Sequence, residues 1–220
     1  MHILLLGATG AIGLHVADEL LAASHTLVIY ARSPQKLPES ILSNSHAQII
    51  KGELSDHITF ESALDRVDTV ISTLGPEGRK HPKGTPLAKF YAYLLDRMKA
   101  RGIKRIIALS TPSYQHPLDK SSLFLRFVIF IIWAFFGGSY DDVIAIANTI
   151  SEAGKYDQDL EWTVIRVPML TNEKRRSYVA GYAGDGKTSN QLARLAYAVF
   201  IVDELEKKEW LGKLPVLSSP

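Results

Sequence analysis

Six short apolar runs, each five to eight residues long and bounded by polar or turn-forming residues, recur along the chain. Runs of this length and composition predict buried strands. They cover residues 2–6, 26–30, 47–51, 67–74, 103–110 and 161–167. The segments between most of them are long enough to return the chain to a parallel neighbour. Because such crossovers are right-handed, the predicted fold class is α/β with a doubly wound parallel sheet.

Residues that favour helix starts stand after several of these runs. Asp56 is expected to cap a short helix after the third strand, and Thr85, followed by proline, a longer helix after the fourth. Thr188 and Ser189 are expected to cap a last helix that ends near Lys208. The chain shows no repeat, linker or low-complexity tract. It therefore predicts a single domain.

The first apolar run breaks into a glycine-rich turn. Gly7, Gly10 and Gly13 follow a Gly-x-x-Gly-x-x-Gly spacing, and Val16 and Leu20 continue one helical face. Glycine gives the turn its φ freedom, lets a pyrophosphate approach the backbone and lets the helix pack closely on the strand. The first amides of the helix then face an anion. This strand, turn and helix predict a Rossmann-type dinucleotide-binding domain.

The end of the second strand indicates which dinucleotide binds. Sites that prefer NAD usually carry an acidic residue about twenty residues past the glycines, which accepts from the ribose hydroxyls. This chain has Arg32 there, with Ser33 and Lys36 close behind. An arginine suits a 2′-phosphate, so the expected cofactor is NADP(H). The alternative is a solvated arginine at a strand end.

A basic loop at residues 77–84 follows the fourth strand. Ligands of α/β sheets bind outside the carboxyl ends of the strands, so this loop borders the expected crevice. Its charges could hold an anionic substrate or cover the site. The alternative is a mobile solvated loop.

Composition excludes several classes of function. The chain has 220 residues, 46% of them hydrophobic, and a formal net charge of only +2, which does not imply a nucleic-acid partner. It has no cysteine, and no histidine pair has the spacing of a metal site, so no metal is expected. The apolar N-terminus lacks the basic leader of a secretion signal, and we expect a cytoplasmic protein.

The glycine turn, the Ala-Arg-Ser-Pro strand end at residues 31–34, and the stretches Ile-Ser-Thr-Leu-Gly at 71–75 and Trp-Thr-Val-Ile-Arg-Val-Pro at 162–168 resemble the atypical short-chain dehydrogenase/reductases. The chain is most similar to their NAD(P)-binding group that includes NmrA-like proteins and the biliverdin-IXβ (flavin) reductases. The resemblance covers nearly the whole chain, from Met1 to about Ser219, within a single domain expected over 1–220. Its motifs specify fold and cofactor more than substrate. A small segment on the substrate side is expected at about 168–190.

The resemblance also implies a set of cofactor-binding residues. These are Thr9, Gly10, Ala11 and Ile12 at the pyrophosphate, between Gly7 and Gly13; Arg32 and Ser33 at the 2′-phosphate; Glu53 and Leu54 at the adenine; Thr73, Leu74 and Gly75 at the ribose; and Pro168, Met169 and Leu170 at the nicotinamide amide.

The chain departs from the family in its candidate proton donor. Most short-chain dehydrogenases lower the pKa of a tyrosine with a lysine four residues on. None of the nine tyrosines here has that lysine. Tyr140 stands nearest the family position, but Ile144 replaces the lysine, and Ser110 ends the fifth strand. Ser110 and Tyr140 are the candidate catalytic residues. Tyr114 and His116, in the loop after the fifth strand, are further candidates for the proton donor. The alternative for Ser110 is a hydroxyl that bonds only to backbone.

Residues 123–136 form the most apolar segment of the chain. Its fourteen residues are fewer than the roughly twenty that span a bilayer, so no transmembrane segment is expected. Three alternatives stand: a helix buried over the sheet, an apolar wall of the substrate pocket or a contact in a homodimer, and an anchor on a membrane surface.

Together these features predict an NADPH-dependent reductase that transfers hydride to a small apolar or aromatic substrate. Two alternatives remain open because a fold does not specify a reaction. One is a non-catalytic, NmrA-like regulator that binds NADP, which the missing lysine favours. The other is a redox-neutral isomerase or cyclase.

Overall fold

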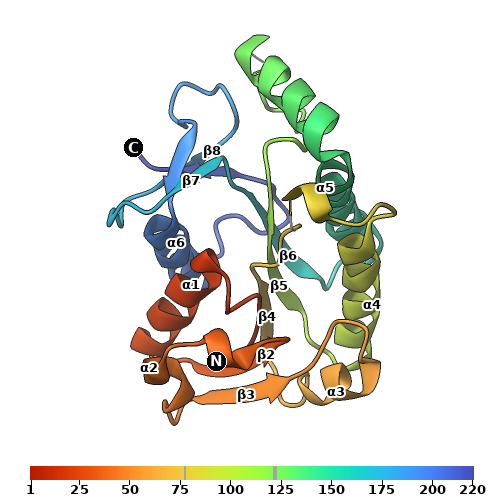
Figure 1. Cartoon of the computed structure of the whole chain (residues 1–220), viewed down its shortest axis with the longest axis vertical. Helices are drawn as coiled ribbons and strands as arrows, with labels where there is room; N and C mark the ends of the chain where they lie inside the picture. The colour runs from red at the N-terminus through yellow and green to blue at the C-terminus, as the bar shows by residue number, and fades with distance from the viewer. Residues whose placement is uncertain (77, 121–122) are drawn as a thin grey trace.

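A central sheet organises the protein, which a computed structural model describes over residues 1–76, 78–120 and 123–220, with side chains from Phe127 onward in the last range. In this described part the sheet has eight strands in the order β3-β2-β1-β4-β5-β6-β10-β8 (Figure 1). All neighbours pair parallel except β8, which runs antiparallel to β10 at the edge. The order changes direction at β1, as in a doubly wound Rossmann sheet, and confirms the predicted fold class.

The strands are β1 (His2–Leu6), β2 (Thr26–Ala31), β3 (Ala47–Lys51), β4 (Thr69–Ser72), β5 (Arg105–Ser110), β6 (Glu161–Arg166), β7 (Met169–Thr171), β8 (Val179–Gly181), β9 (Gln191–Ala193) and β10 (Val216–Ser218). The helices are α1 (Ala11–Ala22), α2 (Glu39–Leu42), α3 (His57–Ser62), α4 (Pro86–Ala100), α5 (Leu123–Tyr156) and α6 (Arg194–Lys207), with 3₁₀ turns η1 (Pro34–Lys36) and η2 (Gly78–Lys80). Strands β7 and β9 pair in a separate small sheet.

Helices cover both faces of the sheet because both sets of alternating strand side chains are apolar. In β1, Ile3 and Leu5 point into the core beneath α1 and α6, whereas Leu4 and Leu6 point into the core beneath α3, α4 and α5. All four side chains are fully buried. Figure 1 shows the sheet between these two helical layers. This burial on both faces explains why the strands read as continuous apolar runs.

The predicted caps are correct in one case and wrong in two. The Asp56 carboxylate accepts from the Thr59 amide at 3.1 Å and caps α3, as expected. Thr85 precedes α4 but makes no capping bond with its side chain. The Asp142 carboxylate of α5 supplies that cap instead, accepting from the amides of Leu87 and Ala88 at 2.9 and 2.8 Å. Sequence could not reveal this cap because its partner lies over fifty residues away.

The last helix begins later than expected. Thr188 and Ser189 do not cap it, since α6 starts at Arg194 and strand β9 intervenes. The Thr188 hydroxyl donates to the Tyr182 carbonyl at 2.8 Å, and that of Ser189 donates to the Ser219 carbonyl at 2.8 Å. Both hydroxyls therefore hold loops together at the carboxyl end of the sheet.

Helix α5 consists of two parts that meet at a kink. Phe136 has the non-helical angles φ −133° and ψ 35°, just before Gly137 and Gly138. The second part packs on the sheet, where Ile146 and Ile150 are buried. The first part extends beyond the rest of the fold (Figure 1). Among the described helices, the stretch Phe127–Tyr156 is long and apolar enough to cross a membrane by length and composition alone.

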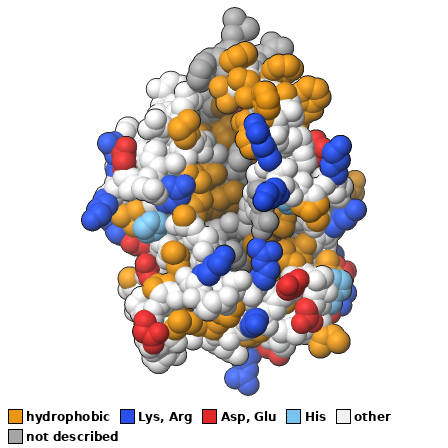
Figure 2. Space-filling model, viewed as in Figure 1, with side chains coloured by type: hydrophobic (Ala, Val, Ile, Leu, Met, Phe, Trp, Pro, Cys, Tyr) orange, Lys and Arg blue, Asp and Glu red, His pale blue; other side chains and the backbone are white. Residues whose placement is uncertain are grey.

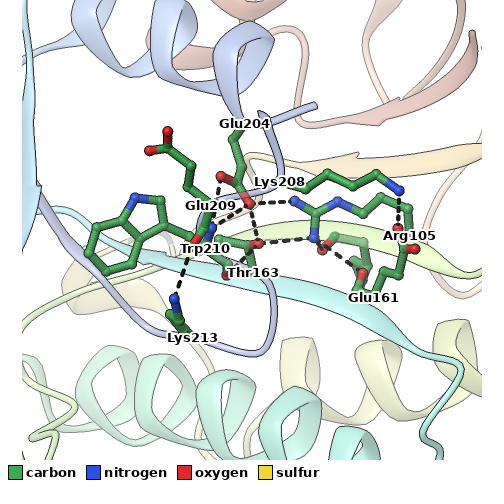
Figure 3. A network of polar contacts seen from close by, with 9 residues as sticks. Arg105, Glu161, Thr163, Glu204, Lys208, Glu209, Trp210 and Lys213 are labelled. Atoms are coloured by element: carbon green, nitrogen blue, oxygen red, sulfur yellow. Dashed lines mark hydrogen bonds and ion pairs between the residues drawn. The ribbon is translucent and has the colours of Figure 1, made fainter. Parts of the chain in front are cut away.

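A buried polar network fixes the amino ends of β5 and β6 to α6 (Figure 3). The Arg105 guanidinium donates to Glu204 at 2.8 Å and to the Thr163 hydroxyl at 2.9 Å. Glu204 also accepts from the Trp210 amide at 3.1 Å. These groups stabilise the edge of the sheet opposite the carboxyl ends of the strands. A buried arginine and carboxylate with these partners are typical of structure and not of a ligand site.

Candidate functional site

The carboxyl ends of the central strands meet at one edge because their registers are level. Leu6 of β1 lies beside Tyr30 of β2 on one side and Ser72 of β4 on the other. The chain then leaves β1 at Gly7 and β4 at Thr73. Arg32 follows two residues after Tyr30. The segments that carry the glycine turn, the arginine and the predicted ribose contacts therefore lie next to one another, at the point where the strand order reverses.

The glycine turn has the geometry of an anion site. Gly7 adopts φ +81°, and a Cβ there would lie 2.6 Å from the Thr73 hydroxyl. At Gly13 a Cβ would lie 2.1 Å from the Gly7 carbonyl oxygen, so that glycine allows α1 to pack on the turn. Gly10 is the N-cap of α1 and no side chain caps the helix there. Its opening amides, among them Ala11, can thus bind a pyrophosphate.

The side chains proposed for the adenosine end stand at the ends of β2 and β3. Arg32 is exposed, and the Ser33 hydroxyl makes no capping bond to η1. Glu53 is exposed, and its carbonyl oxygen accepts from the Tyr30 hydroxyl at 2.8 Å. Burial, with the nearby Asp56 and Glu53 carboxylates, raises the pKa of Tyr30 to about 12, so the phenol stays a donor. Leu54 packs against the core below this loop.

On the other side of the turn, the segment after β4 is tied to β1. The Thr73 amide and hydroxyl both donate to the Leu6 carbonyl oxygen, at 2.9 and 3.1 Å. Leu74 is half-buried against the core and Gly75 is exposed, with no atom within 4 Å of a Cβ added there. This segment therefore presents backbone and small groups towards the crevice, while the Thr73 hydroxyl is engaged by the fold.

A cavity of about 800 Å³ opens beside this crevice. Pro168 and Met169, predicted at the nicotinamide, line it, whereas Leu170 packs against the core instead. One wall is apolar and comes from Val128, Ile129, Ile132, Phe136 and Val143 of α5. The polar lining comes from Thr111, Ser113, Lys120, Ser139, Tyr140, Thr188, Ser189, Asn190 and Gln191. Much of that polar lining was missed by sequence reasoning, because it comes from loops without a motif.

The two candidate catalytic residues differ in their surroundings. Tyr140 is half-buried and lines the cavity. Ser110 is fully buried, does not line the cavity, and donates from its hydroxyl to the Val143 carbonyl at 3.1 Å. The expectation that Ser110 contacts substrate is therefore at odds with its position, and the backbone-bonded alternative describes it. Ser113, three residues further on, does line the cavity.

The basic loop after β4 is attached to α5; Glu77 lies outside the described residues. Ser139 donates from its hydroxyl to the Gly78 carbonyl at 2.6 Å. His81 Nε2 lies 2.6 Å from Asp142 Oδ2, and the Arg79 guanidinium lies 5.4 Å from the centre of the Phe136 ring. Gly78 lines the cavity. Gly78 thus borders the cavity, whereas Arg79, Lys80 and Lys83 are exposed and do not line it, so the basic side chains of the described loop are solvated.

A buried ion pair braces the far rim of the cavity. Arg166, at the end of β6, is fully buried and contacts both oxygens of Asp119, at 2.6 and 2.9 Å. Asp119 also accepts from the amides of His116 and Ala183. Burial raises the pKa of Asp119, but these hydrogen bonds outweigh it and lower the pKa below its usual range. In the sequence, only the position of Arg166 within an apolar strand indicated that this side chain would need a buried acidic partner.

Asp185 organises the neighbouring turn. Its carboxylate accepts from the amides of Tyr182, Lys187 and Thr188, at 3.0, 2.8 and 2.9 Å. Partial burial raises the pKa of Asp185, but the amides outweigh it and lower the pKa to about 2. The turn carries Gly184 and Thr188 to the cavity, so this carboxylate shapes one of its walls.

Comparison with known proteins agrees with this geometry. A family model described as NAD(P)H-binding matches residues 7–208, and the chain belongs to that family. Its fold is that of an NAD(P)H-binding oxidoreductase. Among solved structures, a short-chain dehydrogenase/reductase from Veillonella parvula in complex with NADP superposes with a TM-score of 0.80 at 17% identity, covering 100% of this chain and 94% of that one. A Rossmann-fold NAD(P)-binding family protein from Shigella flexneri gives 0.69 at 22% identity, covering 100% and 93%.

Two plant enzymes share sequence over part of the chain. The chain is 42% identical over 81 residues to a phenylcoumaran benzylic ether reductase of Ginkgo biloba, which covers 34% of this chain and 26% of that protein. It is 33% identical over 113 residues to an isoeugenol synthase of Clarkia breweri, covering 48% and 33%. The matches thus span about a quarter to a third of these relatives.

Proposed function

We propose that the protein is an NADPH-dependent reductase that transfers hydride to a small apolar or aromatic substrate. The observation that carries the proposal is the cavity of about 800 Å³, whose apolar wall from α5 faces Pro168 and Met169. A volume of this size suits a ligand of drug-like dimensions, and an apolar wall with few polar groups is typical of small-molecule sites.

The choice of NADPH over NADH rests on Arg32. Its position two residues after Tyr30, beside the glycine turn, suits a 2′-phosphate and offers no carboxylate to ribose hydroxyls. The Veillonella parvula relative in complex with NADP supports the same preference. A guanidinium can hold two phosphate oxygens at once, which adds geometric selectivity to the charge.

The names of the plant relatives support the substrate class. A phenylcoumaran benzylic ether reductase and an isoeugenol synthase are named for aromatic compounds, in keeping with the apolar cavity. The bound cofactor would supply the hydride. The chain's own part would be to position the ring against Ile132 and Val143 and to offer hydroxyls from Tyr140, Ser113 or Thr111.

Spectrophotometric oxidation of NADPH with enones, quinones, flavins and aromatic propenyl compounds tests the proposal. Ile132 and Ile131 provide a matched pair of variants, because Ile132 lines the cavity and its neighbour is exposed. Ile132→Ser should raise KM by about ten-fold, since it removes apolar contact with the substrate. Ile131→Ser should leave KM unchanged. Equal effects of both variants, or no turnover with any member of the panel, would contradict the reductase.

The second candidate is a regulator that binds NADP without turnover. Two observations favour it. Ile144 stands four residues after Tyr140, where the usual mechanism has a lysine, and the Ser110 hydroxyl donates to the Val143 carbonyl. Calorimetry separates the two candidates: tight binding of NADPH without consumption in the substrate panel supports the regulator. Turnover of substrate with no net consumption of NADPH would instead indicate an isomerase or cyclase.

A further inference from the structure

The first part of α5 has two apolar faces. Val128, Ile129 and Ile132 point to the cavity. The opposite face carries Phe127 and Phe130, which are 61% and 59% exposed. In this helix, which is apolar all round, one face lines the cavity and the other is largely exposed among the described residues.

This outer face gathers several of the large hydrophobic side chains that are exposed among the described residues. It consists of Phe127, Phe130, Ile131, Trp133 and Phe135, and we name these five side chains the α5 outer face. Figure 2 shows hydrophobic side chains gathered at this end of the molecule, with Lys and Arg side chains beside them. Contiguous exposed aromatic surface of this kind marks an interaction site.

The same part of α5 is too short to cross a bilayer. From Leu123 to the kink at Phe136 it has fourteen residues, or about 21 Å at 1.5 Å per residue, against a hydrocarbon core of about 30 Å. The remainder of α5 is committed to the fold, since Ala147 and Ile150 are fully buried. The helix can therefore insert into one leaflet but cannot span the membrane while the domain stays folded.

Basic side chains stand at the base of this helix. The Arg79 guanidinium lies 5.6 Å from the centre of the Phe135 ring, and Lys80 and Lys83 are exposed on the same attached loop. Residues 78–89 include Lys89 as a fourth cation and contain no carboxylate. Residues 127–140 of α5 are likewise without acidic side chains, and Asp142 beyond them is buried against His81. Two acidic residues flank these stretches in the sequence: Glu77, which lies outside the described residues, and the exposed Asp141.

We propose that the α5 outer face docks the protein on an anionic membrane surface. The aromatic side chains would enter the interfacial region, while Arg79, Lys80 and Lys83 contact lipid phosphates and carboxylates. Apolar side chains at the tip and cations at the base are the arrangement that binds peripherally to anionic bilayers. A second copy of the chain fits less well, because a symmetric contact would bring like-charged loops together.

Vesicle flotation with the full chain tests this docking. Vesicles of phosphatidylcholine with phosphatidylserine should bind the protein, and vesicles of phosphatidylcholine alone should bind it far more weakly. Phe130→Ser combined with Trp133→Ser should lower the partition coefficient by at least about ten-fold. Lys80→Glu with Lys83→Glu should lower it by more than about twenty-fold, at about five-fold for each cation lost.

Ile58 provides the matched control. It is 88% exposed on α3 and not part of α5, so Ile58→Ser removes an exposed apolar side chain without changing the outer face. This variant should bind vesicles like the parent, and circular dichroism should show all variants folded. The emission of Trp133, which is 54% exposed, should also shift to shorter wavelength on vesicles.

Three results would overturn the proposal. One is the absence of binding to phosphatidylserine vesicles at low salt, and another is equal binding of the Phe130/Trp133 variant. The third is a stable dimer in analytical ultracentrifugation that dissociates in that variant, which would assign the face to a second copy. The readout is binding alone, so failure here leaves the proposed reductase untouched.

Discussion

The Ser110 hydroxyl donates a hydrogen bond of 3.1 Å to the carbonyl oxygen of Val143. This bond joins the carboxyl end of β5 to α5 and orients the helix on which Tyr140 faces the cavity. A serine at the position where the family places a substrate contact thus serves to position the helix. Because Ser110 bonds to backbone while Tyr140 lines the cavity, substitutions of these two residues should have different effects.

Tyr140→Phe should cost little turnover with any working substrate. Ile144 stands four residues on, where the usual mechanism has a lysine that assists proton transfer by the tyrosine. Ser110→Ala should lower the free energy of unfolding by about 0.5–1.5 kcal/mol and leave kcat near that of the parent. Steady-state kinetics and urea unfolding measure both. A thousand-fold loss in Tyr140→Phe at unchanged NADPH affinity would show that the usual tyrosine mechanism operates without its lysine.

Arg32→Glu should weaken NADPH by about ten- to hundred-fold, or about 1.5–3 kcal/mol, and NADH much less. A charge-assisted contact with the 2′-phosphate would become a repulsion. Lys104→Glu is a suitable control for charge, since Lys104 lies before β5 at the opposite edge and pairs only loosely with Asp159 at 3.4 Å. Calorimetric titration of the parent and both variants with NADPH and with NADH gives the ratio of the two dissociation constants. Equal affinity of the parent protein for NADPH and NADH would refute this role of Arg32.

Gly10→Val and Gly13→Val should have different effects. A Cβ at Gly10 would lie 3.3 Å from the Gly7 carbonyl oxygen, which a small shift accommodates, whereas at Gly13 it would lie at 2.1 Å. Gly10→Val should therefore fold but lose both dinucleotides, because its side chain occupies the pyrophosphate position. Gly13→Val should lower the melting temperature. Normal NADPH binding by a folded Gly10→Val would disprove the phosphate site.

Asp142→Ala should destabilise the protein by about 2 kcal/mol, since it removes the cap of α4 and leaves the amides of Leu87 and Ala88 without a partner. Asp141→Ala is the matched control, because Asp141 is the exposed neighbour and should change stability by less than about 0.5 kcal/mol. Urea unfolding followed by circular dichroism compares the two. Similar losses in both variants would show that the carboxylate does not act as the cap.

Asp185 should make stability depend on acid pH. Its pKa is about 2 in the folded protein, below the ordinary value of 3.8. The carboxylate therefore stabilises the fold above about pH 4, and this contribution is lost as pH falls towards 2. Asp185→Asn should melt lower at pH 6, by about 2–4 °C for about 1 kcal/mol after allowance for solvent screening, and similarly to the parent at pH 2. A constant difference between the two across this range would exclude the carboxylate as its source.

The sequence by itself determined the sheet and the dinucleotide turn. Buried parallel strands must be apolar on both faces, so β1, β2 and β3 were visible as runs, with ends correct to within one residue. The glycine turn was visible because its geometry requires small residues at fixed spacing. Arg32 was visible because it lies at a set distance past that turn. All three are local features: the residues that produce each of them lie within about thirty residues of one another in the sequence.

Only the tertiary structure decided the use of the hydroxyls and carboxylates. The sequence did not show that Asp142, and not Thr85, accepts from the amides at the start of α4. Nor did it show that the Ser110 hydroxyl donates to the Val143 carbonyl and does not contact a substrate. The apolar segment at 123–136 was compatible with a helix buried over the sheet. Among its described residues, 127–136, this alternative is wrong, because the side chains of the α5 outer face are exposed. A side chain's role depends on the group that the fold brings to it, and that group lies far away in sequence.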